Sequence, residues 1–359
     1  MGYICTVVFR FPNPGSDLDR MLRIYSLIAK AAIEQKVDEF DLDFMVKVTA
    51  SNFQASSRGA IGNTAISRSA ESDRSLDPLY NQLKMYSEIY RNMGLLRPLD
   101  RRLKFRTTSL GLSLSIDFEG DDIGKGIARE CLLAMTFPNA TSNNLGITNL
   151  RPFRWLLMLI AELEGKITRH EMILGLLDVD DDREPGVFEE KLELILGLRQ
   201  KGRSDLMAAI ARVAASSKIQ VNTLENYTRF PVGVLKSPIT AWAESKRLSG
   251  IYDRSMDGLE LSDAGMAFAK SLAKKIDVRN CDLQNIPLNE RVHFARYSYY
   301  SLLYRAGLRG KDLFDEIEVS SIGSKSVLEH FVIDSPDSFI YSPHLEESDQ
   351  ILLLAESGT

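Results

Sequence analysis

The sequence predicts a mainly helical α+β fold with small β-hairpins, built from two similar domains. Helical runs with apolar side chains at three-to-four spacing recur between residues 16 and 306. Two separate stretches, 90–111 and 247–265, end in a short strand-like hairpin pattern. The chain has 359 residues, of which 44% are hydrophobic, which is enough for two or three domains with buried cores.

The two hairpin stretches share one cassette. Each is a helical run ending in a glycine, an apolar pair, a polar turn, and a strand-like stretch that closes on Ser/Thr-x-x-Gly. A helix, a hairpin with a polar tip and a further helix are typical of a winged-helix domain. Such a domain presents one helix and its hairpin, the wing, to a nucleic acid. The sequence therefore predicts tandem winged-helix domains.

The first predicted domain covers residues 1–117. We expect a short strand and three helices before its wing, at 3–11, 16–29, 42–48 and 78–93. The segment 50–75 is rich in Ser, Arg, Asn and Gly, and it falls where a helix-turn-helix has its recognition segment. These side chains pair with base edges and phosphate oxygens. Mobile surface loops favour the same residues, so both interpretations stay open.

An acidic, glycine-containing linker is expected at 118–126, and the second predicted domain covers 127–276. Its expected helices are 127–137, 152–163, 171–177, 188–198, 204–215 and 263–275. Thr168 and Glu171 form a capping-box pattern after Gly165, which predicts a helix-turn-helix at the start of this domain.

The last stretch, 277–359, is predicted to be a helical segment with an acidic tail, serving as a linker or a docking subdomain. Its expected long helix, Leu288 to Ala306, carries aromatic residues at several positions. A buried or partner-facing stripe explains them better than a base-stacking platform, because such platforms lie on sheets.

The charge distribution is uneven along the chain. The formal net charge is −5, but residues 311–359 hold 11 acidic and 2 basic residues, which leaves 42 basic and 38 acidic residues elsewhere. Residues 84–106 carry seven Lys or Arg against two acidic residues. Local sign decides what a surface attracts. This basic run is either a solvated surface or, on a predicted wing, a DNA contact.

Several other classes of protein and site are not expected. No apolar run reaches the ~20 residues of a membrane helix, and the N-terminus lacks the features of a signal peptide. The three cysteines are far apart, and the four histidines have no metal-ligand spacing. We expect a cytoplasmic protein without a membrane partner and without a metal site in this chain.

Four stretches carry a resemblance to a known family: 89–96, 105–111, 151–157 and 165–171. With both cassettes placed, residues 20–275 resemble the DNA-recognition region of type IIS restriction endonucleases, the FokI-like and AlwI-like enzymes and related nicking endonucleases. The resemblance implies successive winged helices that read an asymmetric site in double-stranded DNA. It also implies that a separate domain cuts.

The catalytic signature of that family is not found. Its nuclease domains hold an Asp and an (Asp/Glu)-x-Lys pair on adjacent strands, where the carboxylates bind a divalent metal. Asp337 has no such pair downstream, Glu189-x-Lys191 falls in an expected amphipathic helix, and Glu164-x-Lys166 lies at a helix end. No catalytic residue is assigned, and whether the chain is part of an enzyme stays open. Mg²⁺ is expected only for a separate nuclease domain or subunit, which would contact the C-terminal segment.

The candidate DNA-binding residues are polar or basic side chains of the two domains. Those expected near the major groove are Arg58, Asn63, Arg68 and Arg74. Those of the first helix and wing are Lys84, Arg91, Arg101, Arg102, Lys104 and Arg106. Those of the second domain are Arg154, Arg169, Lys246, Arg247 and Arg254.

Three functional hypotheses follow. The first is sequence-specific binding of double-stranded DNA, as the recognition portion or subunit of a type II restriction endonuclease in a restriction-modification system. The second is a winged-helix protein that binds other proteins or acts like a transcription regulator, with no associated nuclease. The third is an intact enzyme whose site the sequence does not reveal.

Overall fold

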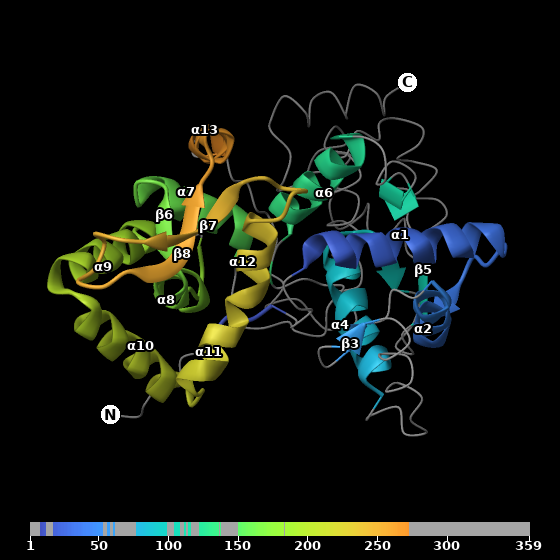
Figure 1. Ribbon diagram of the computed structural model, residues 1–359, viewed down its shortest axis with the longest axis horizontal. Helices are drawn as coiled ribbons and strands as arrows, with labels where there is room; N and C mark the ends of the chain where they lie inside the picture. The colour runs from blue at the N-terminus through green and yellow to red at the C-terminus, as the bar shows by residue number, and fades with distance from the viewer. Residues whose placement is uncertain are drawn as a thin grey trace, which may run out of the picture. The chain divides into compact units, whose positions relative to one another are not determined.

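The computed structural model shows a mainly helical chain with small antiparallel sheets, which confirms the predicted α+β class (Figure 1). The residues that it describes are 8–11, 17–52, 56–57, 60–61, 77–98, 104–107, 111–112, 114–115, 122–135, 137, 150–182 and 184–272. They form two compact units. Unit 1 holds the described residues of 1–19, 135–138 and 144–275, and unit 2 holds those of 20–134. In these ranges, no helix is both long and apolar enough to cross a membrane.

Unit 2 contains helices and a three-stranded antiparallel sheet. Its elements are α1 (Leu18–Glu34), β1 (Phe40–Asp41), α2 (Leu42–Ser51), β2 (Ser56–Ser57), β3 (Ala60–Ile61), α4 (Pro78–Asn92), β4 (Leu96–Pro98), β5 (Lys104–Thr107) and α6 (Asp122–Ala134). Helices α2 and α4, both expected from the sequence, begin after Asp41 and Asp77. Each aspartate side chain accepts a backbone N–H of its helix's first turn. The sheet order is β1-β5-β4, so the last strand is central.

Two buried tyrosines join the helices of unit 2 to its hairpin. The Tyr25 hydroxyl donates to the Leu95 carbonyl (2.9 Å), immediately before β4, and the Tyr90 hydroxyl donates to the Met21 carbonyl. The two rings lie 5.0 Å apart between centroids. Because each hydroxyl has an acceptor, both rings can be buried without an unsatisfied donor.

Unit 1 repeats this order with additional helices. Its elements are α7 (Pro152–Glu162), β6 (Lys166–Thr168), α8 (Arg169–Met172), the π-helical turn η1 (Ile173–Leu177), α9 (Val187–Lys201), α10 (Arg203–Ser217), α11 (Val221–Tyr227), α12 (Arg229–Leu235), β7 (Ala243–Leu248), β8 (Met256–Leu261) and α13 (Asp263–Leu272). The sheet order is β6-β8-β7, so here too the last strand is central. The predicted capping box is confirmed: the Glu171 N–H donates to Thr168 Oγ1, and the Thr168 N–H donates to Glu171 Oε2.

The glycine that closes each cassette has the same structural role in both units. A Cβ on Gly111 would collide with the Leu95 carbonyl, and a Cβ on Gly265 would collide with the Trp242 carbonyl. Leu95 immediately precedes β4, and Trp242 immediately precedes β7. The chain after the central strand therefore passes so close to the start of the edge strand that only glycine fits.

The second cassette does not have the predicted alignment. Residues 247–248, expected to end a helix, belong to strand β7, and Gly250 lies in the turn between β7 and β8. The equivalent of Leu95-Leu96 is therefore Trp242-Ala243, rather than the apolar pair Ile251-Tyr252. The register runs from Ala243↔Leu261 to Leu248↔Met256, which makes this hairpin longer than β4–β5.

Two boundaries also differ from expectation. The described part of the expected strand 3–11 is not assigned to a strand and groups with unit 1, where the Phe9 N–H donates to the Leu177 carbonyl (2.9 Å). Helix α6 begins at Asp122, inside the expected linker 118–126, and groups with unit 2. The expected helix 288–306 and the rest of 277–359 lie outside the described residues.

Candidate nucleic-acid interface

Helix α12 presents one basic stripe. Pro231 cannot donate a hydrogen bond to residue 227, and its ring would meet that carbonyl, which accounts for the break between α11 and α12. From Arg229, the positions i, i+3 and i+7 are Arg229, Val232 and Lys236, which therefore share one face. Arg229 and Lys236 are exposed, and Val232 is partly exposed.

The opposite face of α12 is anchored in an aromatic cluster of unit 1. Phe230 packs against Phe11 and Phe153, with ring centroids 5.1 and 6.1 Å apart. Phe11 also lies against Phe137, at 5.9 Å. All four rings are almost fully buried. The N-terminal segment therefore supports the helix that carries the basic stripe.

The β7–β8 hairpin carries the facing side chains. Four consecutive residues of β7, Glu244 to Arg247, are exposed. Lys246 Nζ lies 2.6 Å from Glu260 Oε2 on β8, and Lys166 Nζ lies 3.6 Å from the other oxygen of the same carboxylate. This contact raises the pKa of Lys246 and lowers the pKa of Glu260, because each charge stabilises the other. Arg247 Nη1 lies 4.0 Å from Asp257 Oδ1.

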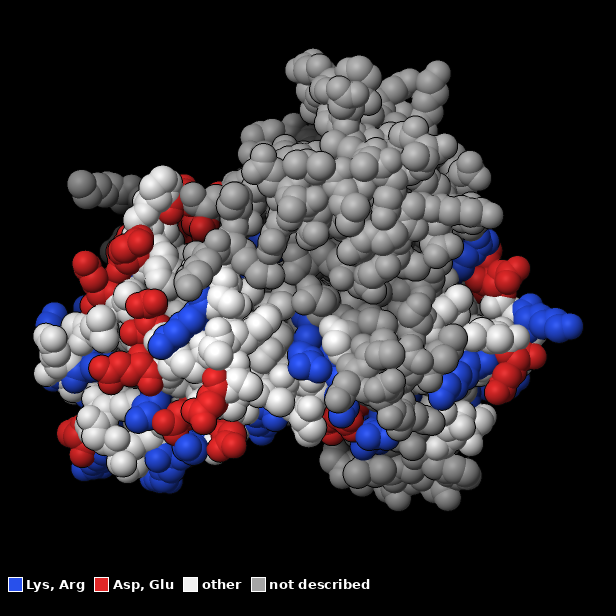
Figure 2. All heavy atoms as spheres, turned by 90° about the horizontal axis from the view of Figure 1, so that it is seen from above, with Lys and Arg blue, Asp and Glu red and all other residues white. Residues whose placement is uncertain are grey.

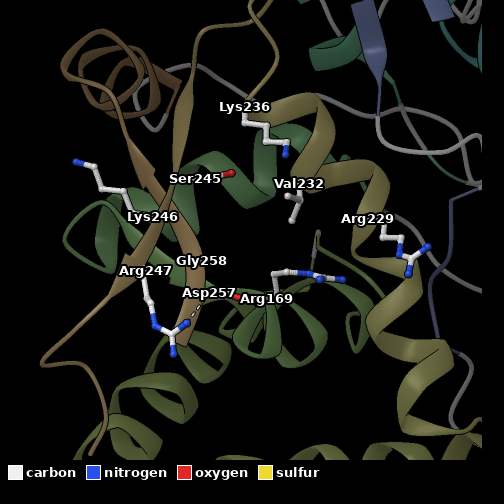
Figure 3. Close-up of a pocket in the computed structure, with 9 residues that line it drawn as sticks. All are labelled: Arg169, Arg229, Val232, Lys236, Ser245, Lys246, Arg247, Asp257 and Gly258. Atoms are coloured by element: carbon white, nitrogen blue, oxygen red, sulfur yellow. Dashed lines mark ion pairs between the residues drawn. The ribbon is translucent and has the colours of Figure 1, made fainter. Parts of the chain in front are cut away.

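An open pocket of about 530 Å³ lies between α12 and this hairpin (Figure 3). Its lining residues are Arg169, Arg229, Val232, Lys236, Ser245, Lys246, Arg247, Asp257 and Gly258. Five of these nine are Lys or Arg, and one is acidic. A concave surface lined by one sign of charge concentrates the opposite sign, so the pocket favours an anion.

The five cations differ in their partners. Lys246 and Arg247 are paired with Glu260 and Asp257, and in Figure 3 Lys246 points away from the side where Lys236, Arg169 and Arg229 lie. Within the described residues, neither Arg229 nor Lys236 has an ion pair. The Ser245 hydroxyl points toward the space beside Val232 and Lys236 (Figure 3). The pocket thus combines two cations that have acidic partners with two that have no ion pair within the described residues.

Arg169 is fixed by the end of α11. Its Nη2 donates to the Glu225 carbonyl (2.8 Å), and its Nε and Nη2 both lie 3.3 Å from Thr228 Oγ1. The neighbouring His170 Nε2 lies 3.2 Å from Glu225 Oε1. A cation at a helix C-terminus satisfies its terminal carbonyls and complements the helix dipole. Arg169 therefore joins α8 to the α11–α12 junction as well as lining the pocket.

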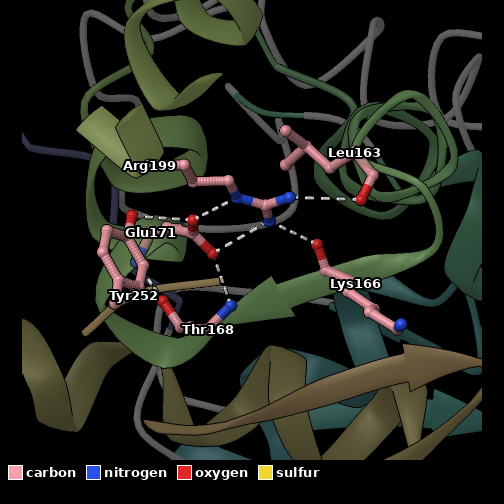
Figure 4. A network of polar contacts seen from close by, with 6 residues as sticks. All are labelled: Leu163, Lys166, Thr168, Glu171, Arg199 and Tyr252. Carbon is pink, nitrogen blue, oxygen red and sulfur yellow. Dashed lines mark hydrogen bonds and ion pairs between the residues drawn. The ribbon is translucent and has the colours of Figure 1, made fainter. Parts of the chain in front are cut away.

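A buried polar network fixes the turn of the hairpin (Figure 4). Glu171, fully buried on α8, accepts from Arg199 Nε (2.7 Å), from the Thr168 N–H (2.7 Å) and from the Tyr252 hydroxyl (2.9 Å). Arg199 also donates to the Leu163 and Lys166 carbonyls. Tyr252 lies in the turn between β7 and β8. The network therefore ties this turn to α8 and α9 with every carboxylate oxygen bonded.

The rest of the visible described surface has mixed charge. Figure 2 shows Lys or Arg side chains interspersed with Asp or Glu on the face that it presents. Among the described residues, Ile33 and Leu196 are the exposed large hydrophobic side chains. The described surface thus offers little apolar area, and the pocket is distinguished from it by its excess of cations.

Six of the candidate residues lie outside the described residues: Arg58, Asn63, Arg68, Arg74, Arg101 and Arg102. The other candidates of unit 2 are divided. Lys84 on α4 and Lys104 on β5 are exposed, whereas Arg106 pairs with Glu39 at 3.1 Å. Arg91 is buried: its Nε donates to the Ser87 carbonyl, its guanidinium lies 5.8 Å from the Phe105 ring centroid, and burial lowers its pKa. Arg91 is therefore placed as a core residue.

In unit 1, the pocket brings together three of the candidates, Arg169, Lys246 and Arg247. Arg154 is partly exposed on α7, and Arg254 is exposed in the hairpin turn; neither lines the pocket. Arg229 and Lys236 were not among the residues predicted from the sequence. Their spacing around Val232, directly before the hairpin, was the available signal, but no helix was predicted at 221–235.

Neither of the two carboxylate-x-lysine motifs was expected to form a nuclease centre. Glu189 and Lys191 belong to helix α9, and Lys191 Nζ pairs with Asp178 Oδ2 at 2.8 Å. Lys166 belongs to β6 and Glu164 to the turn before it. Across the described ranges, no group of three or more His, Cys, Asp or Glu side chains could hold a metal ion.

Comparison of the chain with protein-family models finds no match, and comparison with curated proteins finds no significant match.

Proposed function

We propose that unit 1 binds double-stranded DNA through the surface between α12 and the β7–β8 hairpin. The observation that carries this proposal is the open pocket at that place, whose lining includes the exposed cations Arg229 and Lys236, which have no ion pair within the described residues. Phosphates dominate protein–DNA affinity, and an open pocket lined by exposed cations suits them.

The order of elements supports a winged-helix interpretation of both units. In each, the first helix precedes a short strand, further helices follow, and a hairpin supplies two strands of which the second is central. In a helix-turn-helix protein the later helix enters the major groove, which is about 12 Å wide. By this analogy, α12 in unit 1 and α4 in unit 2 are the groove-facing helices, and β7–β8 and β4–β5 are the wings.

The proposal extends to sequence-specific recognition within a type II restriction system, with the nuclease in another domain or subunit. That extension rests on the resemblance of the cassettes to type IIS recognition regions. A protein-binding role is the competing proposal, and the scarcity of exposed apolar side chains on the described surface disfavours it.

The test is binding of the full chain to labelled duplexes, followed by fluorescence anisotropy over a salt series. We expect saturable binding whose affinity falls as salt rises, and selection from a random duplex pool should enrich one asymmetric site. Failure to bind any duplex at low salt would refute the proposal. Binding without enrichment would retain DNA binding and reject sequence recognition.

A further inference from the structure

We infer that Arg229 and Lys236, together with the Ser245 hydroxyl, form a phosphate-binding site, and that Lys246 and Arg247 are not part of it. This inference deepens the proposed function and rests on it for the source of the phosphate, which is the backbone of a DNA duplex. The juxtaposition that carries it is the pocket wall where the basic stripe of α12 faces β7.

The first step is the availability of charge. A cation that already has an acidic partner gives up that contact when it binds a phosphate, which reduces the gain by the modest worth of an exposed ion pair. Lys246 is 2.6 Å from Glu260, with Glu244 at 4.0 Å, and Arg247 has Asp257 at 4.0 Å. Arg229 and Lys236 have no ion pair within the described residues, and both are exposed to solvent. Their full charge is therefore available to an anion.

The second step is the position of the groups. Arg229 and Lys236 lie on one face of α12, two turns apart, with Val232 between them. The buried contacts of Phe230 hold this face toward the pocket. Arg169, fixed by Glu225 and Thr228, adds positive charge to the pocket lining. The backbone that carries the donors is therefore fixed before binding, which confines the ordering cost to the exposed side chains.

The third step is the chemistry of the ligand. The free groups are a guanidinium, an ammonium and a hydroxyl, which all donate hydrogen bonds to phosphate oxygens. The carboxylate of the pocket, Asp257, has Arg247 as its partner, with 4.0 Å between Arg247 Nη1 and Asp257 Oδ1. Since phosphate contacts carry no sequence information, these residues should set affinity and register without selecting bases.

Two double variants of the full chain test this assignment, because each removes two positive charges from the lining of the same pocket. They are Arg229→Ala/Lys236→Ala and Lys246→Ala/Arg247→Ala. All four side chains are exposed, so both variants should keep the wild-type thermal midpoint. Should an alanine variant fold poorly, the corresponding glutamine variant replaces it. Duplex affinity is measured against salt for at least two unrelated duplex sequences.

The slope of log affinity against log salt should become shallower by about 0.9 in the first variant, since the contact to one phosphate is lost. In the second variant it should change by less than about 0.5. Both results should hold for every duplex. Equal changes in the two variants would overturn the assignment, and so would a loss in the first variant that is confined to one duplex sequence.

A second arm distinguishes the source of the phosphate. Thermal unfolding is followed in inorganic phosphate and in sodium chloride at equal ionic strength. If Arg229→Ala/Lys236→Ala loses duplex affinity and inorganic phosphate does not raise the thermal midpoint of the wild type, the site is assigned to the DNA backbone. If wild type binds no duplex, the proposed function fails, and this arm alone decides the inference. In that case, the site would be one for soluble phosphate if inorganic phosphate raises the thermal midpoint, Arg229→Ala/Lys236→Ala abolishes this rise and Lys246→Ala/Arg247→Ala retains it. If phosphate does not raise the thermal midpoint, the inferred site is overturned.

Discussion

Unit 1 and unit 2 have the same strand order but place their cations differently. In unit 1, the helix before the hairpin carries Arg229 and Lys236 on an exposed face. In unit 2, the corresponding helix α4 carries Lys84 on its surface and Arg91 in the core, against Phe105. The same framework thus uses an arginine for packing in one unit and for the surface in the other.

The hairpins of the two units also differ in how buried their polar contacts are. The turn of β7–β8 is held by Tyr252, Glu171 and Arg199 in a buried network. In unit 2, Arg106 on β5 forms a partly exposed ion pair with Glu39, immediately before β1. Buried charged networks are costly to break, whereas exposed pairs contribute little. A buried network therefore fixes the hairpin turn in unit 1, whereas the buried contact described for the unit 2 hairpin lies at its start, where Tyr25 donates to Leu95.

The largest effect is expected for Glu171→Ala. It leaves Arg199 without its carboxylate, removes the acceptor of Tyr252 and breaks the capping box. Loss of one partner from a buried pair costs about 3–5 kcal/mol. Hydrogen exchange read peptide by peptide should show faster exchange across 150–272 and unchanged exchange across 18–51. Glu244→Ala, which alters an exposed carboxylate of the same unit, is the control, and loss of protection in both units would contradict the comparison.

The closing glycines give the next effect and test the equivalence of the units. Gly111→Ala and Gly265→Ala should each destabilise its own unit by about 1–3 kcal/mol, because the new methyl group would meet a backbone carbonyl. The controls are Gly126→Ala in α6 and Gly197→Ala in α9, where a Cβ meets no atom within 4 Å. Those changes should stabilise by about 0.5–1 kcal/mol. Denaturant unfolding measures all four, and tolerance of alanine at one closing glycine would break the equivalence.

A smaller effect is expected for Tyr252→Phe, which removes only the hydroxyl. Glu171 keeps its bonds to Arg199 and Thr168, so the loss should be about 1 kcal/mol. Amide exchange should accelerate most in 243–261, because the hairpin turn loses its anchor. Arg106→Ala, at the exposed pair of unit 2, should change its hairpin less. The opposite order would show that the buried network does not position the β7–β8 hairpin.

The smallest effect concerns the paired cation of β7. Glu260→Gln should release Lys246, and the slope of duplex affinity against salt should steepen by up to about 0.9. The pKa of Glu260 is lowered, so the ion pair persists above the unfolded value and is lost as pH falls through the folded value. The pKa of Lys246 is raised, so its charge persists into the alkaline range. Wild-type affinity should therefore change little near neutral pH, and a slope unaffected by Glu260→Gln would show that Lys246 is already available to DNA.

The sequence predicted the elements that local chemistry determines. The helix start at Pro78 and the Thr168–Glu171 capping box were predicted, and the structure confirms both. The hairpin of unit 1 was misplaced because the exposed run Glu244 to Arg247 has no alternation of apolar and polar residues. A strand exposed on both sides loses the period-two signal. Prediction of the pocket required prediction of α12, and this seven-residue helix is too short for helical periodicity to reveal it.

The roles of individual arginines could not be predicted, because they depend on partners distant in sequence. Arg199 is 28 residues from Glu171, and Arg169 contacts Thr228, 59 residues away. A basic run in the sequence likewise does not separate Arg91, which is buried, from Lys104, which is exposed. Tertiary packing makes this distinction.

Hydrogen exchange of the full chain with and without a bound duplex tests the central claim most directly. If unit 1 binds DNA between α12 and its hairpin, exchange should slow in 221–236 and 243–261. The account would be contradicted if saturating duplex slowed amide exchange elsewhere in the chain and left the exchange of both segments unchanged.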